Sequence, residues 1–221
     1  MTLNIPNGLV INAILYDSSV KGKGTHAEGI SSLALGEATH SEGYENLAFG
    51  NYAHAEGWGT VAGNVREKDG KIRGNGAHAE GYNTWAKENY THAEGAHTVA
   101  IGSVAHAEGQ DTIAEGNISH AEGAGTHAKG AQSHTEGKDT YAEGNYSHAE
   151  GLETKALQKE AHAEGYKSEA RGEAAHAEGY LSIATGNASH VEGHSNHAEG
   201  HYSHAEGNGT HAKGIYSHAE G

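Results

Sequence analysis

The sequence predicts an all-β fold, a parallel β-roll solenoid with fourteen residues per coil. The first observation is repetition: His-x-Glu-Gly occurs fourteen times in 221 residues, at intervals of fourteen with one gap of twenty-four. The second is composition: with 34 glycines, one phenylalanine, one methionine and 35% hydrophobic residues, the chain cannot fill a conventional globular core. The third is an alternation of small residues that recurs in every repeat. A disordered chain would not keep such a register, so a solenoid is the simplest prediction.

The repeat places one histidine and one glutamate at fixed positions in every coil. We number the histidine as position 0, so the glutamate is at +2. The histidines are His26, His40, His54, His78, His92, His106, His120, His134, His148, His162, His176, His190, His204 and His218. The glutamates are Glu28, Glu42, Glu56, Glu80, Glu94, Glu108, Glu122, Glu136, Glu150, Glu164, Glu178, Glu192, Glu206 and Glu220. The longer gap makes residues 63–72 an insertion, after which the register resumes unshifted.

Each repeat is expected to hold two short strands. Glycine occupies +3 in every copy and +10 in almost all, the exceptions being Glu88 and Gln158, so each half should end at a glycine corner or close approach. Alanine holds +8 throughout and +1 in most copies, while Ser, Thr or Ala dominate −1 and +6. Residues two apart on a strand share a face, so both strands should turn small residues inward. A helix is disfavoured because each interior glycine would cost about 1 kcal/mol.

The outward face of the first strand is predicted to be a subunit interface. Positions −2, 0, +2 and +4 should point outward, and nine of the eleven tyrosines fall at −2 or +4, beside the invariant His and Glu. One roll buries little more than alanine methyls, each worth about 0.8 kcal/mol, against about 1 to 2 kcal/mol of backbone entropy per residue. We therefore expect this face to pack on identical chains, with His–Glu pairs across the interface and histidine pKa values raised by the carboxylates.

Composition also excludes several partners. The net charge of −15 disfavours nucleic acid and anionic membranes, both of which attract positive charge. No segment approaches the roughly 18 apolar residues of a membrane span, so we expect no membrane insertion. The N-terminal residues lack the basic start of a secretory signal, and the absence of cysteine rules out disulfides.

The residues resemble a known family of surface proteins. Residues 98–102 (Thr-Val-Ala-Ile-Gly), and Ser/Thr-x-Ala-x-Gly twice in each repeat, resemble the YadA-like head repeats of trimeric autotransporter adhesins. The His-Ala-Glu-Gly variety is similar to repeats of phage tail-fibre and neck-appendage proteins. The resemblance covers residues 12–221, with a degenerate first coil at 12–14 and 20–22, and implies a homotrimer of left-handed rolls. Residues 1–25 are then an N-terminal cap or attachment segment that includes this coil, and residues 26–221 the repeat domain.

This sequence departs from the family at positions that bear on its attachment. The Val and Ile positions of the family are here largely His and Glu, and we expect neither a coiled-coil stalk nor a membrane anchor after Gly221. We therefore expect a virion appendage in preference to an outer-membrane adhesin.

The insertion is predicted to be a β-hairpin. Its residues alternate around Asp69-Gly70, a two-residue turn signal. It carries the main local concentration of positive charge, at Arg66, Lys68, Lys71 and Arg73. The hairpin could contact a surface ligand or buttress a neighbouring subunit, and the second interpretation is favoured because loops do not carry function by default.

These observations predict a non-enzymatic, extracellular trimeric fibre or adhesin head that attaches to a host glycan or protein, with no cofactor. A phage tail-fibre segment is the first choice and the head of a bacterial trimeric adhesin the alternative. A metal-binding His/Glu ladder is a lower-ranked alternative: zinc sites need convergent ligands in a unique place, and fourteen equivalent rows single out none. Catalysis is disfavoured because an active site needs asymmetry and a cavity.

Overall fold

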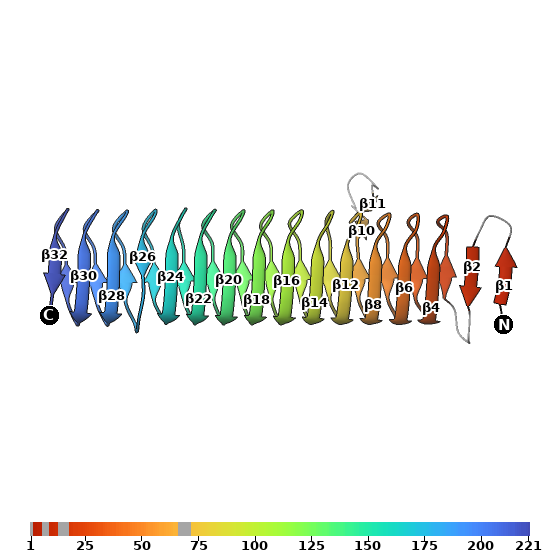
Figure 1. Cartoon of the computed structure of the whole chain (residues 1–221), viewed down its shortest axis with the longest axis horizontal. Helices are drawn as coiled ribbons and strands as arrows, with labels where there is room; N and C mark the ends of the chain where they lie inside the picture. Colours follow the sequence, from red (N-terminus) through yellow and green to blue (C-terminus); the bar gives the residue numbers. More distant parts are fainter. Residues whose placement is uncertain (1, 6–8, 13–17, 66–71) are drawn as a thin grey trace. The chain divides into compact units, whose positions relative to one another are not determined.

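The chain is an all-β parallel β-solenoid with a fourteen-residue period, as the sequence predicts. The computed structural model describes residues 2–5, 9–12, 18–65 and 72–221. The chain forms two compact units, residues 1–112 and 113–221. Each unit consists of stacked coils, and each coil contributes one strand to a first sheet and one to a second sheet (Figure 1). Among the described residues there is no helix long and apolar enough to span a membrane.

In the unit of residues 1–112, both sheets are parallel and in register. The first sheet contains β4 (His26–Ile30), β6 (His40–Tyr44), β8 (His54–Trp58), β12 (His78–Tyr82), β14 (His92–Ala96) and β16 (His106–Gln110). The second sheet contains β3 (Ser19–Val20), β5 (Leu33–Ala34), β7 (Leu47–Ala48), β9 (Val61–Ala62), β13 (Trp85–Ala86) and β15 (Val99–Ala100). His54 pairs with His78, so the register does resume unshifted after the insertion.

The unit of residues 113–221 repeats this arrangement. Its first sheet contains β18 (His120–Ala124), β20 (His134–Lys138), β22 (His148–Leu152), β24 (His162–Tyr166), β26 (His176–Ala177), β28 (His190–His194), β30 (His204–Asn208) and β32 (His218–Glu220). Its second sheet contains β17 (Ile113–Ala114), β19 (His127–Ala128), β21 (Tyr141–Ala142), β23 (Lys155–Ala156), β25 (Glu169–Ala170), β27 (Ile183–Ala184), β29 (His197–Ala198) and β31 (His211–Ala212).

Two antiparallel hairpins lie outside the coils. β1 (Thr2–Ile5) pairs with β2 (Leu9–Asn12) near the N-terminus. β10 (Asn64–Val65) pairs with β11 (Ile72–Arg73) at the base of the insertion. Asp69-Gly70 and residues 13–14 of the proposed degenerate coil lie outside the described residues. Val20 of that coil pairs in register with Ala34, as its position in the repeat predicts.

The interior is a single layer of small side chains. Alanines at +1 and +8, such as Ala149 and Ala156, are fully buried, and the largest fully buried side chain is Val191. Buried Ser and Thr fill most of the remaining inward positions. Both strands therefore do turn their small residues inward.

The glycines allow the coils to stack. At +3, Gly151 has φ 109°, and a Cβ there would lie 2.2 Å from the carbonyl oxygen of Gly165 in the next coil. At +10, a Cβ on Gly130 would lie 1.9 Å from the oxygen of Gly144. Position +3 therefore needs glycine for both backbone conformation and space. At +10 the lack of space favours glycine, although Glu88 and Gln158 are accommodated there.

The turns between strands show that one prediction from the sequence, the place of position −2, is wrong. Position −2, predicted to be an outward strand position, is a turn residue with positive φ, as at Tyr52 (59°) and Tyr146 (61°). Position +5 is also left-handed, for example at Asp139 (54°). The turn is stabilised from position −1, where the Ser147 hydroxyl donates a hydrogen bond to the Gly144 carbonyl at 2.6 Å. A strand-like alternation cannot extend through such a turn, because the chain reverses there.

Candidate functional site

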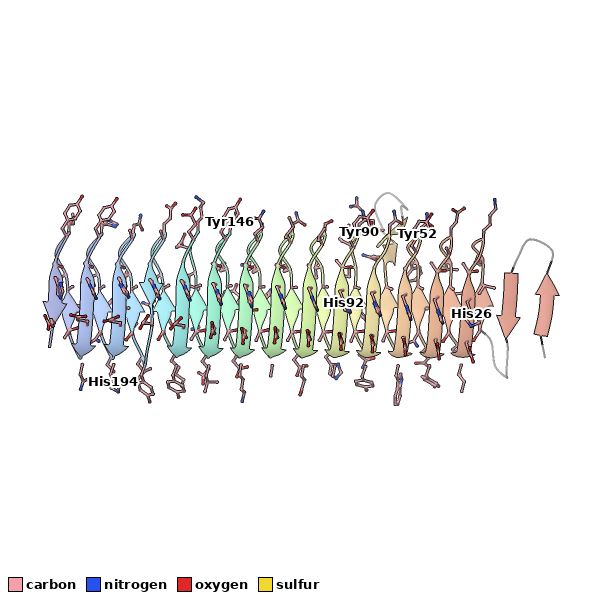
Figure 2. The ribbon with its side chains drawn as sticks, viewed as in Figure 1. His26, Tyr52, Tyr90, His92, Tyr146 and His194 are labelled. Atoms are coloured by element: carbon pink, nitrogen blue, oxygen red, sulfur yellow. The ribbon has the colours of Figure 1, made fainter. Side chains whose placement is uncertain are left out.

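The predicted ladder residues lie on the outer face of the first sheet. In β22, Ala149 points into the core, so His148 and Glu150 on either side of it point outward. The same holds for the other described first-sheet strands. Figure 2 shows the resulting column of imidazoles along the face, with His26 and His92 labelled, and Tyr52, Tyr90 and Tyr146 at the turns on one edge.

The imidazoles of neighbouring coils stack on one another. Ring centroids of His162 and His176 are 4.6 Å apart with planes at 3°, and those of His40 and His54 are 4.8 Å apart at 7°. In-register parallel strands bring identical residues to the inter-strand spacing of about 4.8 Å, so stacking follows from the repeat itself. Each unit therefore presents a continuous imidazole column.

Most of these histidines also lie beside the glutamate of their own strand, whereas His218 lies 3.6 Å from Glu206 of the preceding strand of the same sheet. The distance from Nε2 of His to Oε2 of Glu is 3.3 Å in the His26–Glu28 pair and 3.9 Å in the His92–Glu94 pair. The structure brings these partners together within one chain, and pairing across a subunit interface stays a prediction. The contact within one chain forms because residues i and i+2 of a strand share a face.

Most of these contacts stop short of a hydrogen bond. Nε2 of His26 is within hydrogen-bonding geometry of Glu28. Solvent-shielded Nε2 atoms without a hydrogen-bond partner belong to His40, His54, His78, His92, His134, His148, His162, His176, His190 and His204. A shielded polar atom left in this state costs about 1 to 3 kcal/mol. The column therefore presents hydrogen-bonding capacity to whatever lies against this face.

Burial shifts the histidine pKa values in the direction opposite to our expectation. Burial lowers the pKa of His148 below its ordinary value of 6.5, the imidazoles of His134 and His162 lower it further, and the carboxylates of Glu150 and Glu164 oppose the change. Burial is also the first cause of the lowered pKa of His40, His78, His134 and His176. The expected carboxylate effect is present but weaker than burial in the stack, so the expectation of raised pKa values is wrong at these positions.

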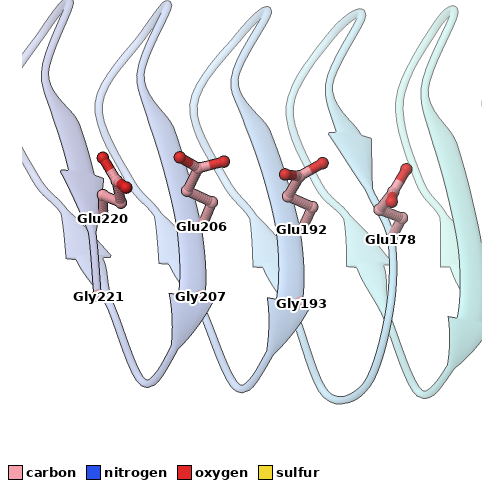
Figure 3. A pocket seen from close by; sticks show the side chains of 7 residues that line it. All are labelled: Glu178, Glu192, Gly193, Glu206, Gly207, Glu220 and Gly221. Atoms are coloured by element: carbon pink, nitrogen blue, oxygen red, sulfur yellow. The ribbon is translucent and has the colours of Figure 1, made fainter.

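The glutamates form a second column beside the histidines. Near the C-terminal end they line a cavity of about 570 Å³, shown in Figure 3; its residues are Glu178, Glu192, Gly193, Glu206, Gly207, Glu220 and Gly221. Bare carboxylates about 4.8 Å apart would repel by about 3.5 kcal/mol per neighbour at an effective dielectric near 20. This column therefore favours a partner that supplies protons, hydrogen-bond donors or positive charge.

Some rows of the ladder bring three possible metal ligands together. His162, Glu164 and His176 form one such group within the described residues, and His176 with Glu178 and His190 forms the next. These groups share residues and repeat the same geometry. The ladder thus offers similar alternatives to a cation, without one distinguished centre.

Aromatic side chains border the ladder at +4. Tyr44 and Trp58 meet edge to face at 5.5 Å, and Trp58 and Tyr82 at 5.4 Å between ring centroids. All three are more than one third exposed. An exposed run of aromatic rings is suited to binding another molecule.

The insertion adjoins a groove on the second sheet. Arg73 Nη1 lies 3.2 Å from Glu88 Oε2, an ion pair that ties β11 to a later coil of the same unit. Arg66, Lys68 and Lys71 lie outside the described residues. A cavity of about 330 Å³ is lined by Phe49, Val61, Gly63, Asn64, Trp85 and Lys87. Lys87 Nζ lies 4.8 Å from the Trp85 ring centroid, and burial lowers the Lys87 pKa.

Two features of the second sheet were missed by the sequence reasoning. The first is this groove, to which exposed Trp85 contributes; the signal available was that the chain has two tryptophans and one lies at an outward second-strand position. The second is a set of His–Glu contacts at +7 and +9, including His127–Glu115 (2.9 Å) and His211–Glu199 (2.7 Å). Their signal is weak because these positions vary between coils.

No protein-family model matches the chain, and no curated protein matches it.

Proposed function

We propose that the chain is a non-enzymatic fibre or adhesin head that assembles as a homotrimer of left-handed rolls. The ladder face of the first sheet forms the subunit seam, and the second sheet faces outward. The assembly is extracellular, as a virion appendage or, second to that, as the head of a bacterial surface adhesin.

The observation that carries this proposal is the contrast between the ladder face and the core behind it. The face keeps His and Glu in every coil and leaves shielded Nε2 atoms without hydrogen bonds, while the core consists almost entirely of Ala, Ser and Thr. Such a core contributes little burial per residue, so each chain gains stability by covering its uniform face. Neighbouring copies of the chain offer the matching repeat, since their polar groups recur at the same spacing.

The outward surface is suited to attachment. Second-sheet side chains differ from coil to coil, so each coil presents a different set of exposed groups to a ligand. Trp85 and Lys87 in the groove beside the insertion combine an exposed aromatic face with a cation. These groups would suit a sugar or a protein loop, so we place the ligand contact there and on the insertion.

The lack of a distinguished row supports a non-enzymatic role. Catalysis depends on groups with different environments converging on one cavity. In the ladder, the same His–Glu pair recurs from coil to coil. A repeated surface of this kind serves assembly better than chemistry at one point.

Binding of the full-length chain to a glycan array and to immobilised extracellular-matrix proteins tests the attachment role. We expect micromolar or tighter retention on at least one ligand, weakened about tenfold or more by Trp85→Ala because exposed aromatic anchors dominate binding surfaces. Lys155→Ala, an exposed second-sheet change outside the groove, is the matched control and should bind normally. Absence of binding across both panels, or equal loss in the two variants, would contradict the proposed attachment surface.

A further inference from the structure

One row of the second sheet brings together the same three ligand types as some rows of the ladder, but with a closer His–Glu contact. His197 and Glu199 lie two residues apart, beginning in β29, and His211 of β31 pairs in register with His197. Oε1 of Glu199 lies 2.7 Å from Nε2 of His211 and 3.6 Å from Nδ1 of His197. The three side chains therefore converge on one point, on the face opposite the ladder.

We infer that His197, Glu199 and His211 form a binding site for a divalent transition-metal ion of the zinc or nickel class. This site goes beyond the proposed attachment function and does not depend on trimer formation. Two imidazole nitrogens and one carboxylate oxygen form a common ligand set for such ions. The three ligand atoms all lie within 4.8 Å of one another.

The geometry needs only small side-chain adjustments to accept an ion. With metal–ligand bonds of about 2.0 to 2.2 Å, ligand atoms of a tetrahedral site lie about 3.3 Å apart. The 2.7 Å contact must therefore open and the longer separations close. All three side chains are between 31% and 42% exposed, so they can rotate without disturbing the alanine core. The remaining coordination position faces solvent and would hold water.

A neighbouring hydroxyl orients one of the ligands. Oγ1 of Thr185 lies 2.9 Å from Nε2 of His197. When Nε2–H donates to that oxygen, Nδ1 keeps the lone pair that faces Glu199. Such outer contacts fix the tautomer and ring orientation of metal-binding histidines. The rings of His197 and His211 also stack at 4.7 Å, which restricts them further.

Positive charges near the site moderate its affinity. Arg171 and Lys213 both act electrostatically on His197. Arg171 is itself paired with Glu169 at 2.7 Å, which reduces its effect. We therefore expect a site that binds zinc without the closed shell of a structural zinc centre.

The same unit contains a natural control row. His127 and Glu115 occupy the positions of His211 and Glu199 and lie 2.9 Å apart, but Ile113 stands where the proposed site has His197. This row offers the His–Glu pair without the second imidazole. It should therefore bind zinc poorly, and Ile113→His should supply the missing ligand.

Calorimetric titration of the full-length chain with ZnCl2, supported by Co²⁺ absorption spectra, tests the site. The native chain should bind zinc at one class of sites with a stoichiometry of one ion per chain. His211→Gln and Glu199→Gln should each lower the zinc affinity of these sites by about tenfold or more. His127→Gln should leave this class unchanged, and Ile113→His should add a second ion per chain. Circular dichroism would check that each variant keeps its fold.

Two results would overturn the inference. One is an unchanged titration in both His211→Gln and Glu199→Gln, which would assign any bound zinc to the ladder. The other is an equal loss on His127→Gln, which would mean that an isolated His–Glu pair suffices and that the second imidazole plays no part.

Discussion

The two sheets of each coil share one core but differ in their outer faces. The first sheet has mostly five-residue strands that carry His and Glu in every copy, whereas the second has two-residue strands whose outward residues change from coil to coil. Both turn alanine inward. Folding therefore requires only the inner positions to be uniform. The uniform outer face of the first sheet calls for another explanation, and the one we propose is a seam between identical chains.

The glycine at +3 gives the largest expected effect. Gly151→Ala would place a methyl group 2.2 Å from the Gly165 oxygen, at a residue with φ 109°. The backbone of the next coil cannot move aside without breaking the hydrogen bonds between strands of the first sheet. We expect loss of cooperative folding, measured by thermal melting in circular dichroism. Gly209→Ala is the control, since its φ of +74° is strained but nothing lies within 4 Å, and it should cost about 1 to 2 kcal/mol. Similar melts for the two variants would show that stacking space is not what selects glycine.

Charge substitution on the two outer faces separates them directly. His148→Glu replaces an imidazole of the ladder by a carboxylate beside Glu150, so repulsion of about 3.5 kcal/mol per near neighbour should dissociate the proposed trimer. Tyr141→Glu makes the corresponding change on the second sheet, where the paired residues are His127 and Lys155, and should leave assembly intact. Light scattering coupled to gel filtration would report the masses. Dissociation of both variants, or of neither, would remove the distinction between the faces.

The histidine stack predicts a loss of stability in acid. Because burial lowers the pKa of His148 and of four other ladder histidines, the unfolded chain binds more protons than the folded chain as the pH falls through about 6.5. Stability should therefore be full above this pH and decline below it, with a fall of several degrees in melting temperature between pH 7 and pH 5. Replacing His134 and His148 by Asn should reduce the slope. A melting temperature that rises towards pH 5 would mean that the carboxylates outweigh burial.

Ion pairs on the second sheet give the smallest expected effect. Lys129 Nζ lies 2.7 Å from Glu143 Oε1, but both side chains are more than 40% exposed. Exposed pairs contribute little because solvent screens them, so Lys129→Ala should barely change the midpoint of urea unfolding. The same measurement in 1 M NaCl should shrink the difference further. A large fall in the urea midpoint would mean that side chains on the variable face stabilise the fold, which would contradict the distinction between the two sheets.

The repeat made most of the fold predictable, and the features that it did not predict also have physical reasons. In-register stacking follows from the period, and the burial of residues such as Ala149 follows from alternation. The left-handed turn at Tyr146 could not be predicted, because a tyrosine at φ 61° carries none of the signal that glycine gives. The lowered pKa of His148 also escaped prediction, since it depends on how deeply the rings stack. Convergence of His197, Glu199 and His211 escaped prediction because positions +7 and +9 vary between coils, although the period places these residues in one row.

Sedimentation equilibrium of the full-length chain at micromolar concentration and pH 8 tests the central claim most directly. If the ladder face is a seam, the chain should sediment as a single species of three times the chain mass. Its apparent mass should not fall towards that of a monomer on dilution. A well-folded monomer under these conditions would contradict it, because the ladder face would then be stable while uncovered.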